Sequence, residues 1–110
     1  MKFINLTEHT VNIPSWDEPI IPSGQVARVK MERTLVATLV ADAGTGTVKL
    51  YRSVAGEVTG LPRAAENTGL IVSTMVRVAL PGRMDLFSPG ELIRDPAGRV
   101  DGARSLDGNT

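Results

Sequence analysis

The chain has 110 residues with equal numbers of basic and acidic side chains, 12 of each, so its formal net charge is zero. This length predicts one domain, and a hydrophobic fraction of 42% is enough for a core. The absence of cysteine excludes disulfides, thiolate zinc sites and cysteine nucleophiles. Balanced charge and few aromatic residues argue against a nucleic-acid partner, because such proteins gather basic and aromatic side chains on one face.

The apolar segments are short. The longest, residues 35–41 and 70–72, fall far below the roughly 20 residues that a transmembrane helix needs. The first residues also lack the apolar core of a signal peptide. We therefore expect a cytoplasmic protein with no membrane partner.

The first third of the chain predicts short strands separated by turns. Residues 2–6 and 10–13 have strand-like patterns, with residues 7–9 as a turn or bulge between them. Residues 14–19 contain two prolines and polar residues that break the pattern. Residues 25–33 alternate between apolar and charged side chains, which predicts a strand with one face inward.

The middle of the chain predicts a hairpin. Residues 35–41 are rich in β-branched side chains and are predicted to form a strand that could be buried on both faces. Residues 42–46 have the composition of a hairpin loop, and residues 47–54 return as a strand. A brief strand follows over residues 56–62, and then a polar loop over residues 62–68.

The pattern changes at residues 69–73, an apolar run that ends in a hydroxyl side chain. Residues 74–80 then predict a short helix, with Ser73 or Thr74 as its N-cap and Pro81-Gly82 as its stop. Residues 85–88 predict a strand that is broken by the following proline and glycine.

The last part of the chain predicts a hairpin and a tail. Residues 92–94 and 99–100 would be its strands, around a turn at residues 95–98. Residues 105–110 are small and polar and predict a flexible tail, so the globular domain is expected to cover residues 1–104. The fold class is mainly β (α+β), a small strand-rich sheet or sandwich-like domain with one short helix near residues 74–80.

The segment from residue 70 to residue 90 suggests a candidate site. If its two strands are parallel, it forms a βαβ-like unit in which Ser73, Thr74 and Ser88 meet at the carboxyl ends of the strands. Open sheets bind ligands at this edge, and the N-terminus of a helix attracts phosphate. The simpler interpretation is that Ser73 only caps the helix and residues 88–90 only turn, since such caps and turns are common.

Further polar residues extend this candidate set. Arg83 and Asp85 follow the helix and could form a surface salt bridge or recognise a ligand. Arg77 lies on the helix, and His9 is the only histidine. Because His9 has no evident partner for a catalytic dyad or a metal site, we predict no catalytic residue, no metal and no cofactor.

Four stretches of the chain resemble a family of small accessory proteins from phages and prophages. They are residues 5–13 (NLTEHTVNI), 21–29 (IPSGQVARV), 56–62 (GEVTGLP) and 79–86 (ALPGRMDL). Glu8 stands where the family has a proline, and Ala103 replaces a frequent cysteine. The family carries no known activity, so the resemblance implies no catalytic residue. It implies a role in binding within the host cytoplasm, such as sequestering nucleotide-derived immune signals or occluding a host protein.

We therefore expect a non-enzymatic protein that binds and sequesters a small anionic ligand, such as a nucleotide-derived immune signal. The predicted ligand-binding residues are Ser73, Thr74, Arg77, Arg83, Asp85, Ser88 and His9. The alternative is a protein-interaction module that inhibits a host protein or assembles as a structural homo-oligomer. A homo-oligomer is expected under both hypotheses, and a hydrolase is the least favoured one.

Overall fold

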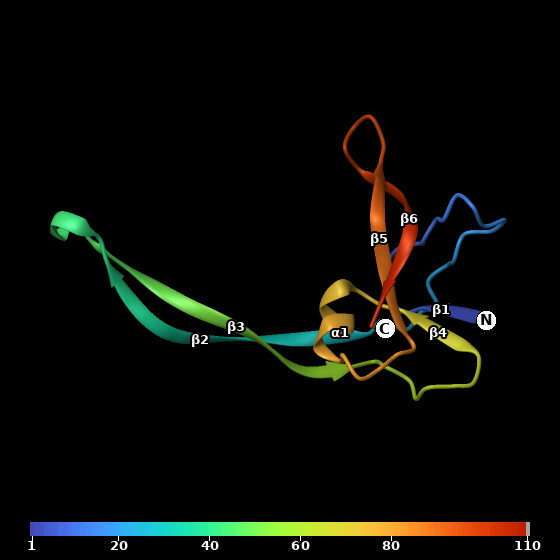
Figure 1. The fold of residues 1–110 in the computed structure, drawn as a ribbon, viewed down its shortest axis with the longest axis horizontal. Coiled ribbons are helices and arrows are strands. Elements are labelled where there is room, and N and C mark those ends of the chain that lie inside the picture. Colours follow the sequence, from blue (N-terminus) through green and yellow to red (C-terminus); the bar gives the residue numbers. More distant parts are fainter. Residues whose placement is uncertain (110) are drawn as a thin grey trace.

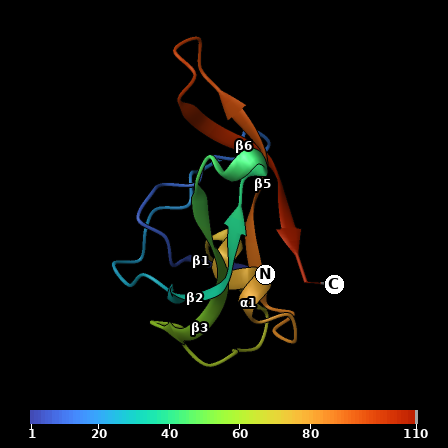
Figure 2. The same cartoon turned by 90° about the vertical axis from the view of Figure 1, so that its left-hand side faces the viewer.

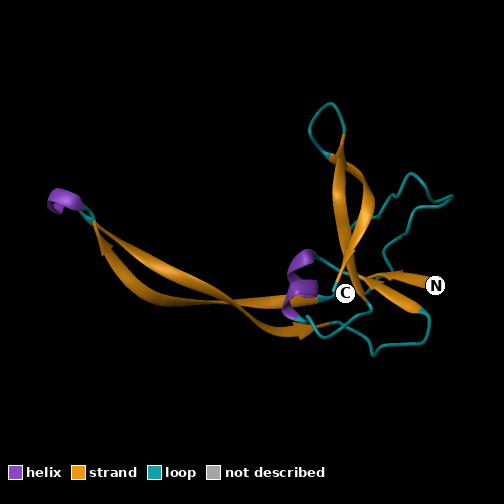
Figure 3. Cartoon of the chain, viewed as in Figure 1, coloured by secondary structure: helices purple, strands orange, loops and turns teal. Residues whose placement is uncertain are grey.

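The computed structural model describes residues 1–109, and for Ala43 the backbone alone. Its first sheet has the strand order β1-β4-β5-β6. The strands are β1 (Lys2–Asn5), β4 (Thr68–Ile71), β5 (Leu86–Arg94) and β6 (Val100–Gly108). Strands β2 (Arg28–Val40) and β3 (Thr47–Thr59) form a separate antiparallel ribbon, and helix α1 (Thr74–Ala79) lies between ribbon and sheet (Figure 1). The predicted fold class, mainly β with one short helix, is confirmed (Figure 3).

The first sheet is built around β4, which runs parallel to both β1 and β5. Successive side chains of a strand point to opposite faces, so Leu70 and Ile71 enter two different cores. The core on the helix side comprises Leu6, Ala27, Leu70, Val72, Val76 and Leu86. The smaller core on the other face contains Val11, Ile13 and Ile71. Val11 and Ile13 belong to the segment between β1 and β2, residues 6–27, which we call the N-terminal segment. In place of the strand predicted at residues 10–13, Val11 forms an isolated bridge with Ile20.

The strand–helix–strand unit predicted between residues 70 and 90 is confirmed. β4 and β5 are parallel, with Leu70 opposite Leu86, and α1 connects them. Ser73 is the N-cap of α1, and its hydroxyl accepts a hydrogen bond from the backbone N–H of Val76. The helix ends just before Pro81, and Val76 is its buried residue. The capping interpretation of Ser73 is therefore correct.

The predicted break at Pro89 and Gly90 is wrong, because β5 continues through them to Arg94. β4 ends opposite Phe87, so beyond that residue β6 is the strand paired with β5. Pro89 therefore lies where one edge of β5 has no paired strand, and such an edge tolerates a residue without a backbone N–H.

The flexible tail predicted for residues 105–110 is wrong for residues 105–108, which form the end of β6 and pair with residues 87–90. A Cβ on Gly90 would lie 2.8 Å from the hydroxyl of Ser105 and 2.6 Å from the carboxylate of Asp107. Gly90 thus makes room for the polar side chains of β6. Thr110 lies outside the described residues.

β2 and β3 form a long hairpin that we call the arm. Its strands have 13 residues each, and the 3₁₀ turn η1 (Asp42–Gly44) joins them at the tip, where the hairpin loop was predicted. β2 merges the two strands predicted over residues 25–33 and 35–41 into one. Val29 and Val58 pack against the core at the base of the arm, but the rest projects from the body (Figure 1). Figure 2 views the arm from its tip.

The arm makes the molecule extended. Its radius of gyration is 18.2 Å, whereas a compact domain of this length has about 13 Å. The burial predicted for residues 35–41 is wrong, since Leu35 is 49% exposed and Val40 is 71% exposed.

Candidate functional site

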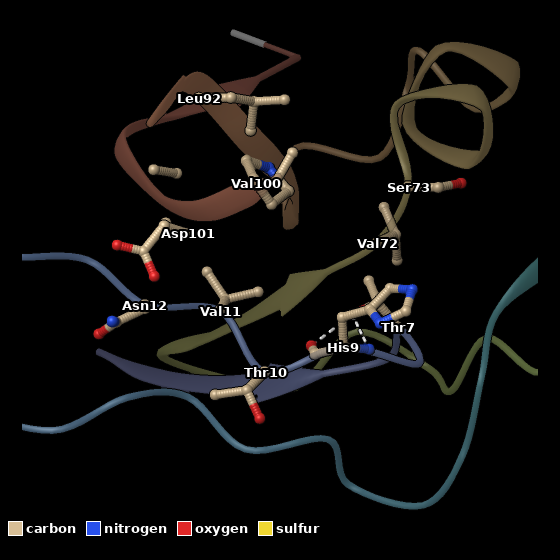
Figure 4. A pocket seen from close by; sticks show the side chains of 13 residues that line it. Thr7, His9, Thr10, Val11, Asn12, Val72, Ser73, Leu92, Val100 and Asp101 are labelled. Carbon is tan, nitrogen blue, oxygen red and sulfur yellow. Dashed lines mark hydrogen bonds between the residues drawn. The ribbon is translucent and has the colours of Figure 1, made fainter. Parts of the chain in front are cut away.

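A pocket of about 520 Å³ opens at the carboxyl end of β4, between the N-terminal segment and the β5–β6 hairpin (Figure 4). The apolar part of its wall comprises Val11, Val72, Pro89, Leu92, Val100 and Ala103. Its polar groups are those of Thr7, His9, Thr10, Asn12, Ser73 and Asp101. A concave site of this size, mainly apolar with a few polar groups, is typical of small-molecule binding.

A second pocket, of about 310 Å³, adjoins the first. The two share Thr7, His9 and Ser73, so these residues stand between them. The smaller pocket also contains Arg28, whose guanidinium forms an ion pair with Glu8. Figure 4 shows Asn12 and Asp101 of the larger pocket away from this shared boundary. The larger pocket thus has an apolar body, and the smaller one contains the ion pair of Arg28 and Glu8, both of which line it.

Asn5 holds the loop that separates the two pockets. It is 1% exposed, and its side chain makes four hydrogen bonds. Its Oδ1 accepts from the backbone N–H of Thr7 at 2.9 Å and from the Thr7 hydroxyl at 2.6 Å. Its Nδ2 donates to the carbonyls of His9 at 2.8 Å and Ile20 at 2.9 Å. The position of Thr7 and His9 therefore depends on one buried carboxamide.

Of the predicted ligand-binding residues, the structure brings His9 and Ser73 together at this boundary. Thr74, the first residue of α1, lines neither of the two pockets. α1 has only six residues, and Ser73 already binds the N–H of Val76 in its first turn. The helix end therefore acts as a capped terminus.

Arg77 and Ser88 bind each other. Ser88 is fully buried, and its hydroxyl accepts a hydrogen bond from Nε of Arg77 at 2.8 Å. Nη1 of Arg77 also donates to the Gly108 carbonyl at 3.3 Å and to Oδ1 of Asn109 at 3.2 Å. These contacts tie α1 to β5 and to the end of β6, which gives both residues a structural role.

Arg83 and Asp85 form a salt bridge away from both pockets, so the predicted salt bridge is confirmed. Nε and Nη2 of Arg83 each lie 2.9 Å from a carboxylate oxygen of Asp85, and Nη2 also donates to the Pro62 carbonyl at 3.1 Å. Hydrogen bonding by the guanidinium lowers the pKa of the Asp85 carboxyl below its ordinary value of 3.8. The same bonds raise the pKa of Arg83.

The salt bridge predicts a pH-dependent contribution to stability. Because the pKa of Asp85 is lower in the folded state than in the unfolded state, its contribution is full above pH 3.8 and is lost as the pH falls through the folded-state pKa. Asp85→Asn should lower the free energy of unfolding by about 1 to 2 kcal/mol at pH 7, since it weakens charge-assisted hydrogen bonds. Urea unfolding at a series of pH values should show that this difference shrinks below about pH 4. The exposed Glu66→Gln is the control, and a difference for Asp85→Asn that is independent of pH would contradict the assignment.

Asn5, Thr7, Asn12, Arg28 and Asp101 were not identified from the sequence as site residues. The one local signal was Asn5-Leu6-Thr7, since asparagine side chains commonly bind the backbone two residues ahead. The others come together only through the tertiary fold.

The fold and the pockets define the chain as a small α+β domain with a ligand-sized pocket and a projecting arm. No protein-family model, curated protein or solved structure matches the chain. The resemblance to phage accessory proteins therefore stays a prediction. Within residues 1–109, no helix combines the length and apolarity needed to cross a membrane, and no three histidine, aspartate or glutamate side chains are grouped to hold a metal ion.

Proposed function

We propose that the chain binds and sequesters a small anionic, nucleotide-like ligand without converting it. The observation that carries this proposal is the pair of adjoining pockets that share His9 and Ser73, one with apolar walls and one with Arg28. A nucleotide has the same two parts, a flat heterocycle and a phosphate. Nucleotide-derived immune signals, which the resemblance implies, belong to this class.

The larger pocket suits the heterocycle. Its aliphatic walls can cover the faces of a ring, and its volume of about 520 Å³ lies within the range of small-molecule sites. Asn12 can donate and accept hydrogen bonds, whereas the Asp101 carboxylate accepts them. Together they can read the polar edge of a base while the walls exclude water from its faces.

The smaller pocket suits the phosphate. Arg28 can bind phosphate oxygens in bidentate fashion. The Ser73 hydroxyl accepts from the N–H of Val76, so its own proton can be donated to a phosphate oxygen. The present partner of Arg28 is Glu8, and the two side chains are 64% and 55% exposed. Exposed ion pairs of this kind contribute only about 0 to 1 kcal/mol to stability, so little free energy is lost when a phosphate displaces the carboxylate.

Isothermal titration calorimetry against linear and cyclic ADP-ribose and cyclic dinucleotides tests the proposal. We expect one of these probes to bind and to be recovered unchanged by chromatography. Arg28→Ala should weaken binding about 10- to 100-fold, because a charge-assisted hydrogen bond contributes about 1.5 to 3 kcal/mol.

The matched control is Arg33→Ala, which removes the same charge from the same strand. The guanidinium of Arg33 lies over the ring of Tyr51, 4.2 Å from its centroid, and lines neither pocket. Affinity should not change in this variant. No heat with any probe while circular dichroism shows folded protein would refute the proposal, as would equal effects of the two substitutions. Conversion of a bound probe would indicate a hydrolase.

A second candidate function is protein binding, which the exposed aliphatic side chains of the arm favour. If this were the whole function, the protein would form complexes through the arm and give no heat with the small anions. The calorimetry therefore separates the two candidates.

A further inference from the structure

The outer half of the arm carries an apolar face. Ala37 is paired with Leu50, and Leu39 is paired with Val48. Residues that face each other across two antiparallel strands share a face, as do residues two apart on one strand, so these four side chains are neighbours. We call them the tip face. Leu39, Leu50 and Val48 are 48%, 45% and 62% exposed.

The tip face has no cover within residues 1–109. Figure 1 shows the outer half of the arm away from the body, and its contacts with the core are made at the base by Val29 and Val58. A two-stranded hairpin is marginally stable in water unless a hydrophobic face packs against something else. The length and apolarity of this arm therefore indicate that another molecule covers it.

We propose that a second copy of this chain covers the tip face. Two copies exchange arms about a two-fold axis, so that the tip face of each lies on the body of the other. Such an interface is isologous and closed, which leaves no open end for further growth.

The charges of the arm and the body are complementary. Residues 28–59 contain five basic and three acidic side chains, so the arm carries a net charge of +2. Because the whole chain is neutral, the remaining residues carry −2. An arm is therefore attracted to the body of a second copy, whereas two arms repel each other.

The area also favours exchange over contact between two arms. The outer half of a ribbon of two 13-residue strands is about 20 Å long and about 10 Å wide, so the tip face covers about 200 Å². In a reciprocal exchange, each copy contributes one tip face and one body surface, or about 400 Å² per partner, which is the size of a weak or transient interface. Contact between two arms would bury half as much.

Size-exclusion chromatography with light scattering tests the assembly. The wild-type protein is expected to have twice the mass of one chain at micromolar concentration. Leu39→Glu places a charge in the tip face and should raise the dimer dissociation constant at least 100-fold. Thr38→Glu is the matched control, because the neighbouring residue on β2 faces the opposite side of the arm and should leave the dimer intact.

Three outcomes overturn the proposal: a wild-type monomer at 100 µM, a Leu39→Glu variant that stays dimeric, or equal effects of the two substitutions. Circular dichroism checks that each variant is folded, which is expected because neither residue belongs to a core.

Photo-crosslinking distinguishes exchange from contact between arms. The chain has no cysteine, so Thr45→Cys at the tip can carry a single benzophenone label. In a mixture of ¹⁵N-labelled and unlabelled chains, crosslinks between copies should join residue 45 to residues outside 28–59. Crosslinks confined to residues 28–59 of the partner would overturn the exchange.

Discussion

Replacing Asn5 by alanine is expected to lower the free energy of unfolding by about 3 to 4 kcal/mol. The substitution removes four hydrogen bonds, each of which contributes about 1 kcal/mol. The carbonyls of His9 and Ile20 then keep one donor each, the Thr7 hydroxyl and the backbone N–H of Val11. Urea unfolding at a fixed protein concentration measures the change, and Trp16 provides a fluorescence signal because its ring packs on Phe3 with centroids 5.2 Å apart.

The same substitution should also lower the affinity for the ligand, even under conditions where the variant is fully folded. Thr7 and His9 line both pockets, and Asn5 fixes the loop that carries them. At a temperature where the variant is folded, calorimetry should show a reduced affinity for any probe that the wild-type protein binds.

The control for stability is Asn12→Ala, which changes an exposed asparagine of the same segment. Its free energy of unfolding should stay within about 0.5 kcal/mol of the wild-type value, as for most surface positions. A similarly small change for Asn5→Ala would show that water replaces the side chain and that the loop does not depend on it.

Local signals explain which elements the sequence could predict. The apolar run before Ser73, the cap itself and the stop at Pro81 are neighbours in the chain, and together they specify a strand followed by a short helix. The parallel pairing on which the strand–helix–strand interpretation was conditional is also local, because α1 is the one helix or strand between β4 and β5. These predictions depend on residues that are close in sequence, and the structure confirms them.

The arm shows where such signals fail. Residues 35–41 are mainly apolar, which predicts burial, but most of these side chains are exposed in the single chain. The strand was predicted correctly and its environment was not. The prediction for residues 105–108 was wrong in the opposite direction. Their small polar side chains predict a loop, but the backbone is held in place by its pairing with β5.

The candidate site could be predicted only in part. His9 and Ser73 line both pockets, and Arg28, which adds a cation, lies 19 residues from His9 in the sequence. Arg77 and Arg83 have the chemistry of phosphate ligands, but Ser88 and Asp85 already bind them. A sequence shows which side chains can bind an anion, but it does not show which of them the fold has already paired.

Replacing Asn109 by alanine is expected to lower the free energy of unfolding by about 2 to 3 kcal/mol, because several hydrogen bonds of about 1 kcal/mol each are lost. Its Nδ2 lies 3.1, 3.0 and 3.0 Å from the carbonyls of Arg77, Leu80 and Arg83. Each of these carbonyls also accepts one backbone N–H, so the carboxamide of Asn109 adds a second hydrogen bond to the end of α1 and to the turn that follows it. Its Oδ1 also accepts a hydrogen bond from Arg77.

Urea unfolding measures the loss, and hydrogen exchange should show faster opening of α1 than of β4 in the variant. The exposed Arg104→Ala on β6 is the control and should change stability by less than about 0.5 kcal/mol. A flexible tail, as the composition of residues 105–110 predicts, would tolerate Asn109→Ala without any change. A clear loss of stability would instead show that the chain stays anchored to α1 through residue 109, so that the end of β6 is part of the folded core rather than an extension of it.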